Sequence, residues 1–221
     1  MKFPNAHNGV KKIFTAEILG LIGTIAMAVA GAAAIILAAL VNAGNGSETS
    51  AAAGAVTAVL AVFGIAGGIL MLIGFILNLV GIKAAMKDEA AFKTAMVFTL
   101  IGIVASVFAT LYSSNETVSG LMKILMDFTQ LCVAVFVIRG IMNLAEKLHN
   151  QKMVAGGRKA TTYMTVAYCL PIVISFVSTL ISLKAESTAT MVLSLIALLL
   201  SIIAYIIFLN YLRRAVKMLE A

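Results

Sequence analysis

One apolar stretch of the chain carries polar side chains at helical spacing. Four of them recur at intervals of four, four and three residues: Ser119, Lys123, Asp127 and Gln130. Residues three or four apart share one face of an α-helix. A charged side chain at the centre of a bilayer costs about 2.5–3.5 kcal/mol. Charges within such a segment are therefore the first candidates for function.

Two interpretations of this face are open. In the first, Lys123, Asp127 and Gln130 line a polar vestibule in which Asp127 binds a cation or a substrate amine. In the second, Asp127 pairs with Lys123, one turn nearer the outer end of the helix, and Lys123 extends its ammonium to the surface. The first predicts a substrate-binding site, and the second predicts only an ion pair that orients the helix.

Other polar residues near the ends of apolar segments have simpler interpretations. Glu17 opens the first segment, where a carboxylate complements the positive end of a helix dipole; a role in proton coupling is the alternative. Arg139 lies at a predicted headgroup level. We interpret Asn78 and Asn210 as interhelical or interfacial hydrogen-bonding groups.

Signatures of catalysis and metal binding are missing from the sequence. It contains no HExxH or GxSxG, and Asp127 is the only aspartate within a predicted span, which excludes a two-aspartate intramembrane protease. Cys132 and Cys169 lack zinc spacing and are predicted to be buried. His7 and His149 lie in separate polar segments. We predict no enzymatic activity, no metal site and no cofactor.

The composition indicates the environment of the chain. Hydrophobic residues make up 62% of it and charged residues 11%, against about 45–50% and about 25% in soluble domains. This excess can face only lipid, where every backbone polar group needs an internal partner and only helices or closed barrels can span. The long apolar runs lack strand alternation, so we predict an all-α, polytopic transmembrane helical bundle.

Six segments reach the length of about 20 residues that a membrane-spanning helix needs. We predict a single transmembrane domain over residues 1–221, with spans at about 17–42, 53–81, 94–113, 119–142, 162–183 and 189–212. Pro171 predicts a bend in the fifth span, and residues 155–157 (Ala-Gly-Gly) predict a break before it.

Small residues in these spans predict close helix packing. Gly64 and Gly68 form a GxxxG pair. Stripes of small and hydroxylic residues in other spans include Gly20, Gly23 and Gly31 in the first and Gly102 in the third. The alternative is that such stripes line a pathway for a small polar solute.

Basic residues gather on one side of the predicted spans. The termini, two of the connections and Arg139 hold 14 of the 16, and only Lys123 and Lys184 fall toward the other side. The positive-inside rule then places both termini in the cytoplasm of a multi-pass protein of the cell membrane. Because membrane orientation explains the net charge of +7, we predict no nucleic-acid partner.

The spans group into three helical hairpins with similar cytoplasmic ends, at 75–83, 136–139 and 207–214. A threefold repeat of hairpins is one explanation. The other is that any hairpin ending at this face shows apolar residues followed by Asn, Lys or Arg.

Two stretches, Gly9–Leu19 and Ile76–Ala95, resemble a group of uncharacterised bacterial multi-pass membrane proteins. They cover less than a fifth of the chain. The resemblance implies a bacterial inner-membrane location and no assigned activity, so no functional residue is carried over.

Two functional hypotheses follow. The first is small-solute or ion transport by a permease, a channel or a substrate-binding transport subunit, with a small polar or cationic solute as its partner. The alternative is a non-catalytic membrane assembly, immunity or scaffold subunit, which short outer loops favour. Both are in contact with the lipid bilayer. Because the sequence has no ATP-binding motif, active transport would need either an ion gradient or a separate ATPase subunit. A membrane protein partner or an ATPase subunit is therefore a candidate partner.

Overall fold

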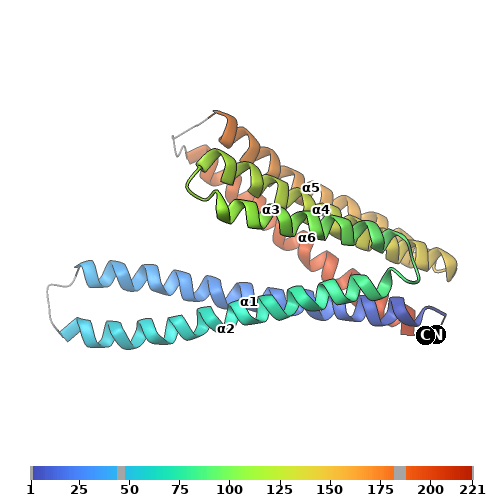
Figure 1. Ribbon diagram of the computed structural model, residues 1–221, viewed down its shortest axis with the longest axis horizontal. Helices are drawn as coiled ribbons and strands as arrows, with labels where there is room; N and C mark the ends of the chain where they lie inside the picture. Colours follow the sequence, from blue (N-terminus) through green and yellow to red (C-terminus); the bar gives the residue numbers. More distant parts are fainter. Residues whose placement is uncertain (1, 44–47, 182–187, 221) are drawn as a thin grey trace. The chain divides into compact units, whose positions relative to one another are not determined.

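The computed structural model describes residues 2–43, 48–181 and 188–220, in which all regular secondary structure is helical (Figure 1). The helices are α1 (Pro4–Ala43), α2 (Glu48–Ala85), α3 (Ala91–Leu111), α4 (Glu116–Lys147), α5 (Gln151–Ile181) and α6 (Thr188–Glu220). The prediction of an all-α fold is confirmed for these residues.

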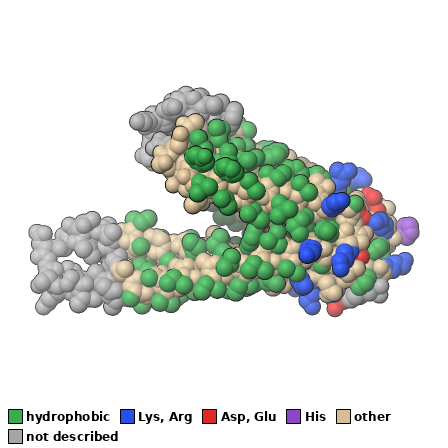
Figure 2. All heavy atoms as spheres, viewed as in Figure 1, with side chains coloured by type: hydrophobic (Ala, Val, Ile, Leu, Met, Phe, Trp, Pro, Cys, Tyr) green, Lys and Arg blue, Asp and Glu red, His purple; other side chains and the backbone are tan. Residues whose placement is uncertain are grey.

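Within the described residues, five helices contain stretches long and apolar enough to cross a membrane. These stretches are Pro4–Ile36, Val56–Ala85, Ala91–Leu111, Thr117–Lys147 and Leu199–Glu220. Their large apolar side chains are turned outward (Figure 2): Ile35 is 73% exposed and Leu111 is 70% exposed. Lipid is the solvent that such surfaces match. The helices are thus apolar enough for a multi-pass membrane protein; the predicted span 162–183 runs past Ile181, beyond the described part of α5, so the number six stays a prediction.

Each helix begins before its predicted span, and two of them do so by more than ten residues. α1 begins at Pro4, whose fixed φ suits the first helical position. Glu17 therefore lies more than about three turns inside α1, and its predicted place at the helix start is wrong. α5 runs without interruption from Gln151 through residues 155–157 and across Pro171, so the predicted break is also wrong. Hydropathy indicates where lipid begins, not where a helix begins.

The link between α4 and α5 is short and its backbone groups are bonded. His149 adopts a left-handed φ of 55°. The N–H of Asn150 donates to the Ala145 carbonyl at 2.8 Å, and that of His149 donates to the Glu146 carbonyl at 2.9 Å, a Schellman pattern. The Asn150 side chain then accepts from the N–H of Met153 at 3.2 Å and caps α5.

The described chain separates into two compact units. Unit 1 comprises Met1–Lys11 and Leu79–Ala221, and unit 2 comprises Lys12–Asn78. In unit 1, α3 packs on α4, α4 on α5 and α5 on α6. Its fully buried large side chains lie close in sequence to basic residues, and they include Val10, Ile82, Ile141, Leu144 and Leu212. The core of unit 1 therefore extends to the charged ends of its helices.

Unit 2 is an antiparallel hairpin of α1 and α2 that packs through small residues. A methyl group built on Gly67 would lie 2.9 Å from the Gly23 carbonyl oxygen, and one on Gly74 would lie 2.8 Å from the Ala16 carbonyl oxygen. The contact residues are seven apart on each helix, the period that keeps two long helices in contact along one seam.

The predicted pair Gly64 and Gly68 does not make this contact. A methyl group on either would meet nothing within 4 Å in the described chain. The described hairpin does not use this pair, because a four-residue spacing suits a single crossing point and the hairpin packs through a seven-residue repeat. Of the predicted stripe in α1, Gly23 does pack closely, whereas a methyl group on Gly20 or Gly31 would meet nothing within 4 Å in the described chain.

Adjacent glycines of α2 provide a matched test of this seam. We expect Gly67→Ala to lower the free energy of unfolding by about 1–3 kcal/mol, because the new methyl group forces two backbones apart. We expect Gly68→Ala to be neutral or slightly stabilising, because its methyl group has free space. Thermal unfolding in mild detergent, followed by circular dichroism, compares the two; equal effects would contradict the seam.

Candidate functional site

The predicted substrate-binding face lies on α4 in unit 1. Lys123 and Gln130 are exposed and Asp127 is half-buried. Among the described residues, no ion pair or hydrogen bond joins Lys123 to Asp127. The Asp127 side chain is thus half-buried and has no direct bond to a basic group of the described chain. Its carboxylate can accept hydrogen bonds from an amine or bind a cation, and the Gln130 amide one turn away can supply a further polar contact.

The opposite side of this part of α4 is fixed against α3. Thr129 is buried, and its hydroxyl donates to the Met126 carbonyl at 2.8 Å. A methyl group on Gly102 of α3 would lie 2.9 Å from the Thr129 hydroxyl oxygen, which confirms the close packing predicted at Gly102. Phe98 of α3 stacks on Phe136 of α4 with ring centroids 5.6 Å apart. These contacts set the rotation of α4, and with it the direction in which Asp127 faces.

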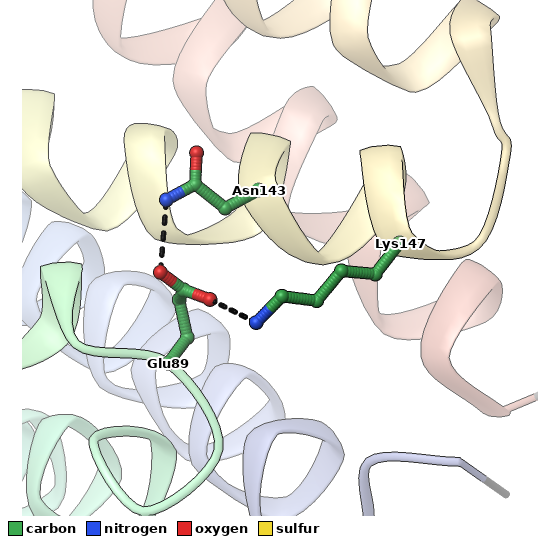
Figure 3. A network of polar contacts seen from close by, with 3 residues as sticks. All are labelled: Glu89, Asn143 and Lys147. Carbon is green, nitrogen blue, oxygen red and sulfur yellow. Dashed lines mark hydrogen bonds and ion pairs between the residues drawn. The ribbon is translucent and has the colours of Figure 1, made fainter.

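A denser polar network, which the sequence did not predict, lies where α4 ends (Figure 3). The connection between α2 and α3 brings Glu89 to α4. Asn143 donates its amide to Glu89 Oε1 at 2.8 Å, and Lys147 donates its ammonium to Glu89 Oε2 at 2.6 Å. Asn143 and Lys147 are four residues apart on one helix face. The single Glu89 carboxylate therefore binds two side chains that lie one turn apart on α4.

The neighbouring Asp88 binds the start of α1. Its Oδ2 accepts from the backbone N–H of Ala6 at 2.7 Å, and its Oδ1 accepts from the Asn5 amide at 3.0 Å. The first N–H groups of a helix have no partner within it, and a carboxylate also complements the dipole there. The Lys147 ammonium lies 5.9 Å from the centre of the Phe3 ring. We call Asp88, Glu89 and their four bonded partners the acidic clasp.

Glu89 is held in its ionised form by this network. Burial raises the pKa of Glu89, but the hydrogen bonds from Lys147 and Asn143 and the charge of Lys147 outweigh burial. The net result is a pKa below the ordinary glutamate value of 4.5. The Glu89 side chain is 9% exposed and that of Lys147 is 51% exposed, so the pair is partly screened by solvent. The clasp holds helix ends together and has no nucleophile beside a base.

The clasp escaped prediction because its partners are distant in sequence. Asp88 and Asn5 are 83 residues apart, and Glu89 and Asn143 are 54 apart. One signal was available: Asp88 and Glu89 are adjacent acids in a connection otherwise rich in lysine. The carboxylate predicted for the start of the first helix was assigned to Glu17, and Asp88 takes that place in the structure.

Glu17 instead contacts the second helix of unit 2. The Asn78 amide donates to Glu17 Oε1 at 3.3 Å, which confirms Asn78 as an interhelical hydrogen-bonding group. Asn210 is exposed. The interpretation of the two cysteines as buried is wrong for Cys169, which is exposed, and Cys132 is half-buried. Both residues lie in apolar helices, where lipid can cover a thiol as well as protein can.

No group of three or more His, Cys, Asp or Glu side chains in the described chain could hold a metal ion. Nor does any protein family, curated protein or solved structure match the chain. The two candidate functional sites of the described chain are therefore the Asp127 face and the acidic clasp.

The clasp predicts a pH-dependent stability. Glu89→Gln should lower the free energy of unfolding near pH 7 by about 1 kcal/mol, because it removes one charge-assisted bond to a half-exposed lysine. The folded-state pKa of Glu89 is depressed. Its contribution is therefore complete above the unfolded-state pKa and is lost as the pH falls through the folded-state pKa.

Thermal unfolding of the wild type and Glu89→Gln, at neutral pH and in steps below about pH 4.5, measures this contribution. We expect the two proteins to differ at neutral pH and to converge in acid. Glu146→Gln is the control, because Glu146 is an exposed carboxylate one residue before Lys147. A difference that persists unchanged in acid, or a Glu146→Gln effect of the same size, would contradict the assignment.

Proposed function

We propose that the chain is a six-span protein of the bacterial inner membrane, with both termini cytoplasmic, that moves a small polar or cationic solute or an ion. In this proposal it is a permease, a channel or a substrate-binding transport subunit and catalyses no reaction. The outward-facing apolar side chains of the described helices support the membrane location. The gathering of 14 of 16 basic residues at one side supports the orientation.

The half-buried Asp127 is the observation that carries the transport proposal. A carboxylate within an apolar helix costs free energy, and neither an ion pair nor a hydrogen bond within the described chain offsets that cost at Asp127. A bound cation or substrate amine would offset it. Lys123 and Gln130 flank Asp127 on the same face, and we assign the three residues to solute binding.

A non-catalytic assembly, immunity or scaffold subunit is the second candidate. The observation that favours it is the open space beside Gly64 and Gly68. Glycines four apart allow another helix to approach closely, and this pair is not used by the described chain. A membrane protein partner, including the membrane-embedded part of an ATPase complex, is the kind of molecule that would pack there.

Asp127→Asn tests the transport proposal. The substitution keeps the shape of the side chain and removes its charge, so we expect loss of a co-purifying small molecule with little loss of expression. Native mass spectrometry of the tagged protein, extracted in mild detergent, measures both the bound molecule and any stoichiometric partner. Glu146→Gln makes the same chemical change at an exposed position of α4 and should change neither.

Three outcomes are distinguishable. A bound molecule lost in Asp127→Asn and retained in Glu146→Gln supports solute binding. A protein partner that is lost in Gly64→Leu, with no small molecule present, supports the assembly subunit. An equal fall in expression for Asp127→Asn and Lys123→Ala, with any bound molecule or transport signal retained, contradicts the assigned site and indicates a purely structural pair.

The topology gives a separate prediction. A reporter that is active only in the cytoplasm should be active when fused after the last residue, and inactive when inserted in the connection at Ser113–Asn115. The second position is the control, because the proposed orientation places it outside. Activity at both positions, or at neither, would contradict six spans with cytoplasmic termini.

A further inference from the structure

The ends of α5 and α6 carry six exposed basic residues: Lys152, Arg158, Lys159, Arg213, Arg214 and Lys217. On α6 the spacing of Arg213, Arg214 and Lys217 places them on one face, and Asn210 continues that face by one turn. Tyr211, Leu212 and Ala215 take the opposite face and are buried. The packing of α6 therefore determines which way its basic side chains face.

A close contact sets the register of the two helices. A methyl group on Gly157 of α5 would lie 2.6 Å from the Tyr211 hydroxyl oxygen, and one on Gly156 would lie 3.8 Å from the Tyr211 ring. Arg158 follows Gly157 directly, and Arg213 follows Tyr211 by two residues. At about 1.5 Å per residue, the six side chains lie within a few turns of this contact. We call the six residues the α5–α6 basic surface.

Acidic residues do not neutralise this surface. The described part of α5 contains no acidic residue, and that of α6 contains only Glu220, beyond Lys217. Of the other acids at this end of unit 1, Asp88 and Glu89 are bonded within the acidic clasp, and Glu146 of α4 forms no ion pair with the six basic residues in the described chain. The clasp uses Lys147, and the six residues of the α5–α6 basic surface are in none of its bonds. Their positive charge therefore faces outward.

The same helix faces continue into exposed apolar side chains. On α5, Tyr163 is 53% exposed and Val166 is 57% exposed. On α6, Ile206 is 52% exposed and Ile203 is 54% exposed. Each apolar pair lies one to a few turns from the basic residues of its helix. A ligand that matches this sequence of surfaces has an anionic head joined to an apolar tail.

We propose that the α5–α6 basic surface binds the phosphate headgroups of anionic phospholipids, whose acyl chains lie along the adjoining apolar faces of α5 and α6. The guanidinium fork of arginine matches a phosphate with two parallel hydrogen bonds. Basic side chains beside membrane spans also attract anionic lipids electrostatically. The inference requires that the chain be embedded in a membrane, and it is independent of transport.

Lipid titration of the full, delipidated chain tests this proposal by native mass spectrometry in mild detergent. The probes are phosphatidylglycerol and phosphatidylcholine with identical acyl chains. We expect phosphatidylglycerol to bind more tightly to the wild type, and to lose at least about tenfold in affinity in Arg158→Gln/Arg213→Gln/Arg214→Gln. Its binding should also weaken as salt is raised, whereas that of phosphatidylcholine should not.

Lys2→Gln/Lys83→Gln/Lys87→Gln is the matched control, because it removes the same charge from exposed residues elsewhere in unit 1. It should keep most of the preference for phosphatidylglycerol. Equal losses in the two triple variants would overturn the assignment to α5 and α6, and equal binding of the two lipids to the wild type would overturn the proposal.

If the glutamine variant does not fold, Arg158→Lys/Arg213→Lys/Arg214→Lys replaces it. This variant keeps the charge and loses the two-pronged hydrogen bonding, so we expect a weaker preference for phosphatidylglycerol. An unchanged preference would contradict headgroup recognition by the arginines. Solute binding at Asp127 is measured separately, so a negative lipid result leaves the transport proposal standing and a negative Asp127 result leaves this one standing.

Discussion

The need of every peptide group for a hydrogen-bond partner dominates this structure. Hydrocarbon offers no partner, so a chain that crosses it must bond within each segment. Within the predicted span this need accounts for α5 remaining helical across Pro171, a residue that favours a break in water. It also explains why irregular backbone in the described chain is confined to short connections. There, polar side chains such as Asn115 and Asn150 supply the missing bonds.

Helices that satisfy this need still require a reason to associate, and lipid removes the usual one. Apolar side chains gain little by leaving lipid for protein, so close packing must replace the hydrophobic effect. The hairpin of unit 2 does so through Gly67 and Gly74, whose missing side chains let carbonyl groups of α1 approach. In unit 1, Gly140 admits the Phe92 ring in the same way. At the charged helix ends, hydrogen bonds to Asp88 and Glu89 fix the orientation of the helices in addition to close packing.

The sequence predicted the parts of this fold that depend on one segment alone. Apolar length identified the helices. The predicted stripes of small residues marked close contacts at Gly23 and Gly102 but not at Gly20 or Gly31. It failed where the answer depends on the rotation of one helix against another. In the sequence, Gly64 and Gly68 are as suitable for close packing as Gly67 and Gly74. In the structure, the face of α2 that carries Gly67 and Gly74 is the one in contact with α1. The partner of Asp88 lies more than eighty residues away, and no local pattern encodes that distance. The residues of the predicted site were placed on one face of α4 by spacing, but spacing cannot show what that face meets.

Three carboxylates of unit 1, those of Asp88, Glu89 and Asp127, differ in whether the described chain supplies them with hydrogen-bond donors. Each oxygen of Glu89 has a donor, and Asp88 has an amide and a backbone N–H, so the clasp is explained by the contacts it makes. Asp127 has no bonded donor in the described chain, although it lies in a more apolar stretch. The cost of burying its charge is offset only in part, by the positive charge of Lys123 one turn away. A buried charge that the fold compensates only in part is where a bound solute has the most free energy to contribute, and this is why we propose solute binding at Asp127 and a structural role for Glu89.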